Sequence, residues 1–311
     1  MQKNNINNLI NIDDEIDLRE LFTVLFQGKW IIIFITFIVS LGGILYSLQL
    51  PNIYHSKALI VPVDSSSGVS GSLGAYSGIA GLAGISLPSS SGETNSAKAI
   101  VKLSSLSFFE KNILPYIFLP NLLAVDSWDS KTNTLTYNKN IYDEISNKWV
   151  RYSDKQIPSA QESFRLFVSE HLEISEDKKT GFITLTIKHQ SPFIAKKWAE
   201  LAINEINTFY RQKDRLESEK AVSYLNQQIA MTSLAEIKLV IAELLQKETQ
   251  KLALIQANQS YVFDYIDPPA VMEKKSEPAR AIICILSLIL GAMLSIFIVL
   301  TKHYAFKVKA F

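Results

Sequence analysis

Two stretches of this 311-residue chain are predominantly apolar and carry no charged residue, and each is long enough to cross a lipid bilayer. They occupy residues 30–54 and 281–301, and Arg280 and Lys302 bracket the second. A hydrocarbon core about 30 Å thick needs roughly 20 helical residues, and an ionised residue at its centre costs about 3 kcal/mol on the insertion scale. The pattern predicts transmembrane helices at residues 30–50 and 281–301. Two buried core helices are the alternative, which the length and the missing charge both disfavour.

The segment before the first stretch argues against a cleaved signal peptide, because residues 1–29 are acidic and no small-residue cleavage site follows. We expect an uncleaved anchor, with residues 1–29 and 302–311 as cytoplasmic tails and 51–280 on the other side. The bias of positive charge is slight, so this orientation rests on the readiness of long loops to cross a membrane. Leu18, Leu21, Phe22 and Leu25 have helical spacing, which predicts a short amphipathic helix at the membrane surface.

Composition excludes several kinds of partner and chemistry. Lys and Arg number 31 against 30 Asp and Glu, so no basic field exists to hold a nucleic acid. The single cysteine rules out an intrachain disulfide, and the four scattered histidines make a histidine cluster improbable. The sequence contains no H-E-x-x-H, G-x-S-x-G or Walker A motif. We therefore expect no catalytic site, no metal and no cofactor.

The region between the two apolar stretches has equal numbers of basic and acidic residues and mixes strand and helix patterns. Strands are predicted at 56–63, 182–188 and 261–266, and helices at 97–113 and 163–171. Residues 65–92 are rich in Gly and Ser, which suits either a flexible linker or a loop that packs its apolar residues on a neighbour. The predicted fold class is α+β, with an α/β base formed by about 51–190 and 260–267.

Residues 193–258 contain neither Pro nor Gly and predict a long helical hairpin that projects as a stalk. An S-x-x-E cap beginning at Ser233 indicates a reversal near residues 231–233. About 37 residues at 1.5 Å each would extend roughly 55 Å, which favours side-by-side packing of several copies. The candidate stalk and oligomer contacts are Leu234, Ile237, Ile241, Leu245 and Leu252.

Small residues recur at a spacing of four in both apolar stretches, which lets helix backbones approach closely in lipid. Chance is the alternative, since Gly and Ser are common in such helices. Prolines before the second stretch predict an extended connection into the membrane. The packing and connection candidates are Gly43, Ser47, Ser287, Gly291, Ser295, Pro268, Pro269 and Pro278.

Several short motifs, in this order and spacing, resemble the Wzz-type polysaccharide chain-length determinants, the class 1 polysaccharide co-polymerases with two membrane spans. The likeness covers nearly the whole chain, and one departure is the second proline of the pair, where the family often has a small residue. The motifs that carry it are residues 16–21 with Lys29 and Trp30, residues 81–87, 175–181, 219–225, 266–270 and 273–275, and Pro278 with Gly291.

The resemblance implies a multi-pass protein of the bacterial inner membrane with its bulk in the periplasm, assembled as a ring-like homo-oligomer. It implies a non-enzymatic regulator of O-antigen (lipopolysaccharide) chain length that acts with a Wzy-type O-antigen polymerase, and contact with the growing lipid-linked polysaccharide. The alternative is an adaptor or exporter component for capsule or exopolysaccharide that works with a separate tyrosine kinase, since we expect no kinase domain in a ten-residue tail.

Overall fold

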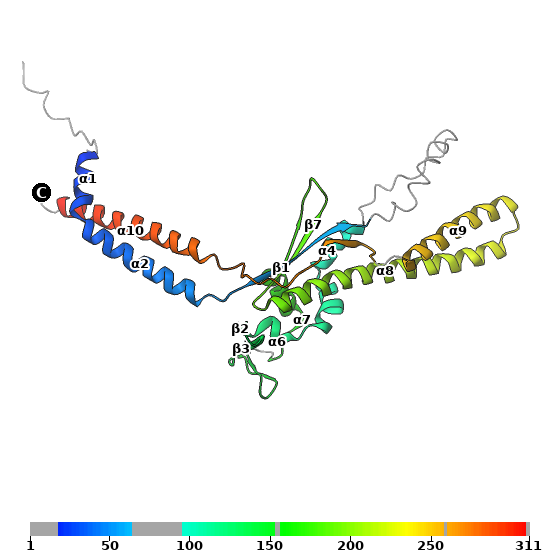
Figure 1. Ribbon diagram of the computed structural model, residues 1–311. Coiled ribbons are helices and arrows are strands. Elements are labelled where there is room, and N and C mark those ends of the chain that lie inside the picture. The colour runs from blue at the N-terminus through cyan, green and yellow to red at the C-terminus, as the bar shows by residue number, and fades with distance from the viewer. Residues whose placement is uncertain (1–17, 64–94, 153–155, 258–259, 309–311) are drawn as a thin grey trace, which may run out of the picture. The chain divides into compact units, whose positions relative to one another are not determined.

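The computed structural model describes residues 18–63, 95–152, 156–257 and 260–308. The chain divides into a terminal unit, Met1–Pro51 with Glu277–Phe311, and a central unit, Asn52–Ser276. Figure 1 shows the elements of both units in chain order. The Gly- and Ser-rich segment 65–92, its motif at 81–87, and residues 16–17 of the first motif lie outside the described residues.

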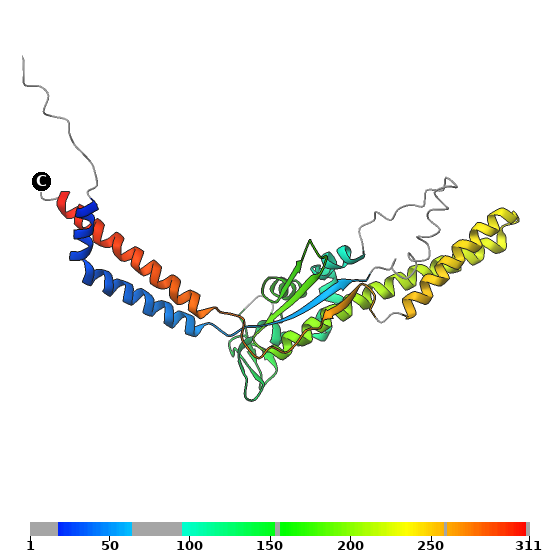
Figure 2. The ribbon, with the colours of Figure 1, turned by 45° about the horizontal axis from the view of Figure 1, so that its top comes forward.

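The terminal unit consists of α1 (Leu18–Gln27), α2 (Lys29–Gln49) and α10 (Arg280–Val308). By length and composition α2 and the Arg280–His303 part of α10 could each cross a membrane, so the two predicted apolar helices are confirmed. They pack side by side in both ribbon views (Figures 1 and 2). Val24 of α1 is buried where α1 packs against α10.

A four-stranded antiparallel sheet forms the base of the central unit, in the order β6-β7-β1-β8. The strands are β1 (Tyr54–Pro62), β6 (Leu172–Glu176), β7 (Ile183–His189) and β8 (Phe263–Asp267). Tyr54 pairs with His189 and Ile60 with Ile183, while β8 closes the other edge of β1. The predicted strands at 56–63, 182–188 and 261–266 are confirmed, whereas β6 carried no clear sequence signal.

One face of the sheet is covered by the first half of α8 (Pro192–Met231), which places Ala, Trp and Ile side chains against β7. Burying one such Ile or Leu contributes about 1.5–3 kcal/mol relative to leaving it exposed. The small alanines allow the helix axis to approach the strands. The fully or nearly fully buried contacts are Ile183, Leu185, Ile187, Ala195, Trp198, Ala199, Ala202, Ile203 and Ile206.

Short helices complete the base: α4 (Asn95–Leu103), α5 (Leu106–Phe108), α6 (Leu119–Leu123) and α7 (Ala160–Leu166). The prediction of one continuous helix over 97–113 is wrong, because α4 and α5 are separate helices. Ser105 interrupts it, because its hydroxyl donates to the Lys102 carbonyl at 2.7 Å and caps α5 through the Phe108 amide. The helix predicted at 163–171 is α7 followed by a π-helical turn, Phe167–His171.

Two small hairpins between α6 and α7 were not predicted: β2 (Val125–Asp129) with β3 (Thr134–Tyr137), and β4 (Tyr142–Asp143) with β5 (Lys148–Trp149). Their turns contain Asn133 and Asn147, each with φ of 52°, a conformation that Asn tolerates better than most residues. The buried Tyr142 ring forms their centre, packed edge-on against neighbouring aromatic rings. These hairpins therefore form an aromatic lobe beside the base.

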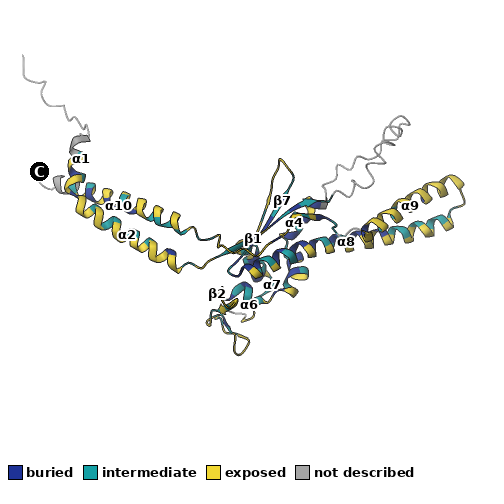
Figure 3. Ribbon diagram, viewed as in Figure 1, coloured by how far each residue is buried: buried dark blue, intermediate teal, exposed yellow. Residues whose placement is uncertain are grey.

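The helical hairpin consists of α8 and α9 (Ala235–Ala257), and its reversal falls at residues 232–234, as predicted. The boundary expected at residue 193 needs correction, because α8 is buried in the base as far as Tyr210. In Figure 3 the buried colour follows the first half of α8, and α9 is largely exposed. The projecting part of the hairpin therefore starts after residue 210, and α8 belongs to both base and stalk.

Candidate functional site

The seam between α2 and α10 contains the predicted small residues. A Cβ added at Gly43 would lie 2.4 Å from both Cβ and Oγ of Ser287, far closer than real carbon contacts. A Cβ at Gly291 would lie 3.1 Å from Val39 Cβ and 3.2 Å from Thr36 Cα. The two helices therefore approach closely at the points where a side chain is missing.

Hydroxyl groups occupy the rest of this seam. Ser295 is fully buried; its hydroxyl donates to the Ala292 carbonyl at 2.8 Å and lies 3.3 Å from Thr36 Oγ1. Ser287 donates to the Cys284 carbonyl at 2.9 Å. Ser47 is 2% exposed, and its Oγ makes no hydrogen bond within the described part of the chain. Short polar side chains thus fill the seam and are satisfied mainly within their own helix.

The three predicted prolines lie in different surroundings. Pro268 is exposed and Pro269 is buried, directly after β8. The buried Ser56 of β1 donates to the carbonyl of Ala270 at 2.9 Å, which fixes the segment beyond the prolines to the sheet. Pro278 belongs to the terminal unit and follows a cis peptide bond just before α10.

The five stalk candidates separate onto two faces of the hairpin. Ile241 is 9% exposed, and Leu245 and Leu252 are half-buried on the side of α9 that packs against α8. Leu234 and Ile237 are 62% and 46% exposed. Ile237, Val240 and Leu244 are exposed and, at positions i, i+3 and i+7, share one side of α9, which we call the outer apolar face.

Polar side chains of α8 hold the returning chain at the root of the hairpin. Asn207 Oδ1 accepts the amides of Val262 and Phe263, both at 2.9 Å, and its Nδ2 donates to the Phe263 carbonyl at 2.9 Å. Two turns further on, Asp214 accepts the Tyr261 hydroxyl at 2.5 Å. Together they fix the segment that leads from α9 into β8.

This root lies in a highly charged stretch of α8, residues 211–220, yet part of it is buried. Asp214 and Ser218 are buried, whereas Leu216 is 50% exposed. Burial and the Asp214 carboxylate raise the pKa of Tyr261, and burial raises the pKa of Tyr265 to about 12. Both phenols therefore stay protonated at neutral pH, and Tyr261 remains a donor.

Two of the four histidines, His171 and His189, stack in the base although they are 18 positions apart in the sequence. The rings of His171 and His189 lie 5.7 Å apart, and Trp198 contacts both edge-on. His189 Nδ1 accepts the Ser191 amide at 2.8 Å, and its Nε2 faces the Asn121 carbonyl at 2.9 Å. These partners require the neutral ring with its proton on Nε2.

Burial lowers the pKa of His189 to about 4 and also lowers the pKa of His171. The pair therefore joins α6, the π-helical turn and β7 as neutral hydrogen-bonding groups. Within the described residues, no three His, Cys, Asp or Glu side chains are grouped as metal ligands would be. The histidines meet because the π-helical turn that ends at His171 packs against β7, which ends at His189, and their spacing in the sequence held no signal of it.

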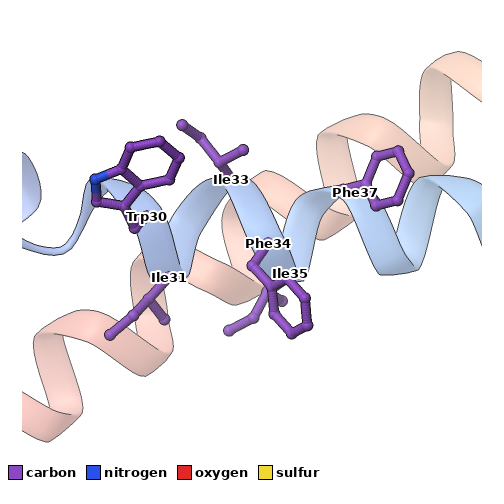
Figure 4. A pocket seen from close by; sticks show the side chains of 6 residues that line it. All are labelled: Trp30, Ile31, Ile33, Phe34, Ile35 and Phe37. Atoms are coloured by element: carbon purple, nitrogen blue, oxygen red, sulfur yellow. The ribbon is translucent and has the colours of Figure 1, made fainter.

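An apolar hollow of about 630 Å³ lies on the outer surface of α2. Its lining comes from one helix, as Figure 4 shows: Trp30, Ile31, Ile33, Phe34, Ile35 and Phe37. The indole N–H of Trp30 is the one polar side-chain group in this lining, which is too few to orient a substrate. The hollow suits contact with lipid chains better than catalysis.

Comparison with known families gives a match between residues 14–111 and the family described as "Wzz: Chain length determinant protein". The Wzz-type resemblance is confirmed. The matched region begins before α1 and ends in the base, so it covers α2 and β1. No curated protein matches the chain.

Two solved structures are similar to this chain at low identity. One is described as "full-length bacterial polysaccharide co-polymerase", with 16% identity, coverage of 94% of this chain and 99% of that one, and a TM-score of 0.40. The other is a "Fragment of WzzB, Polysaccharide Co-polymerase from Salmonella Typhimurium", with 13% identity, coverage of 73% and 100%, and a TM-score of 0.30.

Proposed function

We propose that this protein regulates the length of O-antigen chains without making or breaking bonds itself, as an oligomer that acts with a Wzy-type polymerase in the bacterial inner membrane. The match of residues 14–111 to the chain length determinant family is the observation that carries the proposal. The proposed topology places the central unit in the periplasm and both tails in the cytoplasm, with α2 and α10 as the membrane spans.

The outer apolar face supports assembly through the hairpins. Its three large side chains form an exposed stripe on a projecting helix, and contiguous exposed apolar surface marks interaction sites. Copies packed along this face would form a wall of parallel hairpins around a common axis. Repeated weak contacts between such a wall and a growing glycan would strengthen as the glycan lengthens, which is one way to sense length.

The decisive experiment replaces the chromosomal gene and resolves surface polysaccharide by gel electrophoresis. Deletion is expected to abolish the modal band distribution, and the wild-type gene should restore it. An unaltered distribution after deletion would contradict the proposal.

A variant pair tests the role of the outer apolar face. Ile237→Asp with Leu244→Asp introduces two negative charges on that face, and Gln246→Asp with Gln250→Asp introduces the same two charges at exposed polar positions elsewhere on α9. We expect only the first pair to reduce the oligomer to smaller species in detergent and to broaden the length distribution. If the two pairs have the same oligomer size and the same length distribution, the outer apolar face has no special role in assembly or in length control.

A further inference from the structure

Helix α1 has three distinct faces. Leu21, Val24 and Leu25 point inward, and Val24 is buried where α1 packs on α10. Gly28 is buried at the end of α1, and an added Cβ there would lie 2.6 Å from Val299 Cγ1. Leu21 and Leu25 belong to the stripe expected to lie at the membrane surface, but in the structure they are half-buried on the side of α1 that packs against α10.

A separate row of large aromatic rings points away from this contact. Phe22 and Phe26 of α1 are 74% and 69% exposed and, at positions i and i+4, lie on one face of that helix. Trp30, in the first turn of α2, is 75% exposed. Phe34 and Phe37 follow it on α2 at i+4 and i+7 and are 65% and 63% exposed, so the exposed rings extend from α1 onto one face of α2. Thr23 and Gln27 form the third, polar face of α1.

Positive charge accompanies the aromatic row. The ammonium of Lys29 lies 4.9 Å from the centre of the Phe26 ring. Lys302 is exposed on α10 one turn beyond Val299, the residue that meets Gly28. Both lysines therefore lie at the same end of the helix pair, just outside the apolar segments. Aromatic rings and lysines together are typical of the boundary between acyl chains and headgroups, and lysines there attract anionic lipids.

We propose that α1 is a lipid-interface anchor: the rings of Phe22 and Phe26, together with Trp30 at the start of α2, insert at the headgroup boundary of an anionic leaflet, while the opposite face of α1 clamps α10. This inference rests on the proposed membrane placement of α2 and α10. A partner protein covering the row is the competing occupant. The continuity with α2 and the flanking lysines favour the bilayer, because both describe a surface that lies at the edge of a hydrocarbon layer.

Site-directed spin labelling of the full chain tests the anchor. Cys284→Ser removes the single cysteine, and labels are placed by Phe26→Cys, Gln27→Cys and Phe37→Cys in bilayers of phosphatidylethanolamine and phosphatidylglycerol. At Phe26 we expect relaxation by oxygen to exceed relaxation by a water-soluble nickel chelate several-fold. At Gln27, the matched neighbour on the polar face, the ratio should reverse.

The Phe37 label separates failure of the anchor from failure of the proposed topology. If it is oxygen-accessible while Phe26 is open to the nickel chelate, α2 lies in lipid and the anchor is refuted. If neither reagent reaches Phe26, protein covers the row and the lipid assignment is again overturned. Lys29→Gln with Lys302→Gln should lower the oxygen preference at Phe26 in phosphatidylglycerol bilayers and leave it unchanged in purely zwitterionic ones; no change in either refutes the charge component.

Discussion

The protein contains two antiparallel helix pairs that are held together in opposite ways. Between α2 and α10 the contact is made by missing or very short side chains, Gly43 against Ser287 and Gly291 against Thr36. Between α8 and α9 it is made by large apolar ones such as Ile241. Water drives the burial of large side chains, whereas in lipid helices gain from close backbone approach. The chemistry of each seam therefore matches the solvent proposed for it.

The largest expected effect concerns the root of the hairpin, which is held by hydrogen bonds from Asn207 and not by either kind of helix contact. Asn207→Ala removes three hydrogen bonds to the backbone of Val262 and Phe263 and leaves buried groups unpaired. Each such loss costs about 1–3 kcal/mol, so we expect destabilisation on the order of 3 kcal/mol. Thermal unfolding of the full chain in detergent, followed by tryptophan fluorescence, measures it. Asn207→Asp, which keeps the acceptor, should lose less; equal loss would contradict this account.

The next test breaks the small-residue seam. Gly43→Leu places a side chain where even a Cβ would overlap Ser287, while at the adjacent Gly42 a Cβ would meet nothing within 4 Å. Overpacking costs about 1–3 kcal/mol, so Gly43→Leu should lower the stability of the helix pair and Gly42→Leu should not. Cysteine cross-linking between α2 and α10 reports the pairing. Similar cross-linking in both variants would mean that the close approach is unnecessary.

A third comparison sharpens the description of the water-exposed pair. Ile241→Ala truncates a side chain in the α8–α9 seam, and Ile237→Ala truncates one on the outer apolar face. We expect about 2 kcal/mol of destabilisation from the first and under about 0.5 kcal/mol from the second in the dissociated protein. Ile237→Ala should instead weaken oligomers. If Ile237→Ala destabilised the dissociated protein more than Ile241→Ala, then Ile237 and not Ile241 would be the residue packed between α8 and α9.

The smallest effect is a pH dependence confined to the base. The pKa of folded His189 is about 4, against about 6.5 in an unfolded chain. Between these values the unfolded state binds more protons, so stability falls as the pH is lowered, by up to about 1.4 kcal/mol per unit. The free energy of unfolding, measured with denaturant at pH 6.5 and 5.5, should therefore differ by about 1 kcal/mol. His189→Gln should flatten this slope even if the variant is less stable.

Local patterns predicted the elements that depend on a single periodicity. The two apolar helices, the hairpin reversal before Ala235, and strands β1 and β7 all follow from runs of apolar residues or their spacing. The aromatic lobe escaped prediction because its strands have two to five residues and depend on the turns at Asn133 and Asn147. Such short strands are stable only when rings like Tyr142 pack over them.

The candidate site was predictable in its residues and less so in its contacts. Gly43 and Gly291 were identified by spacing, but which residue each faces depends on how α2 and α10 are paired. Asn207 and Asp214 were missed because polar residues in a charged helix look solvated, and their partners are 47–56 positions away. His171 and His189 meet only because the π-helical turn lies over the end of β7.

Helix α8 runs without interruption over 40 residues from the sheet to the tip of the hairpin. Its first half is fixed in the base by Trp198 and Ile206, so the rest behaves as a lever. At 1.5 Å per residue Met231 lies about 30 Å beyond Tyr210, and a rotation of about 5° at Tyr210 displaces that end by roughly 3 Å. A small rotation of α8 where it leaves the sheet would therefore become a displacement of several ångströms at the tip of the hairpin.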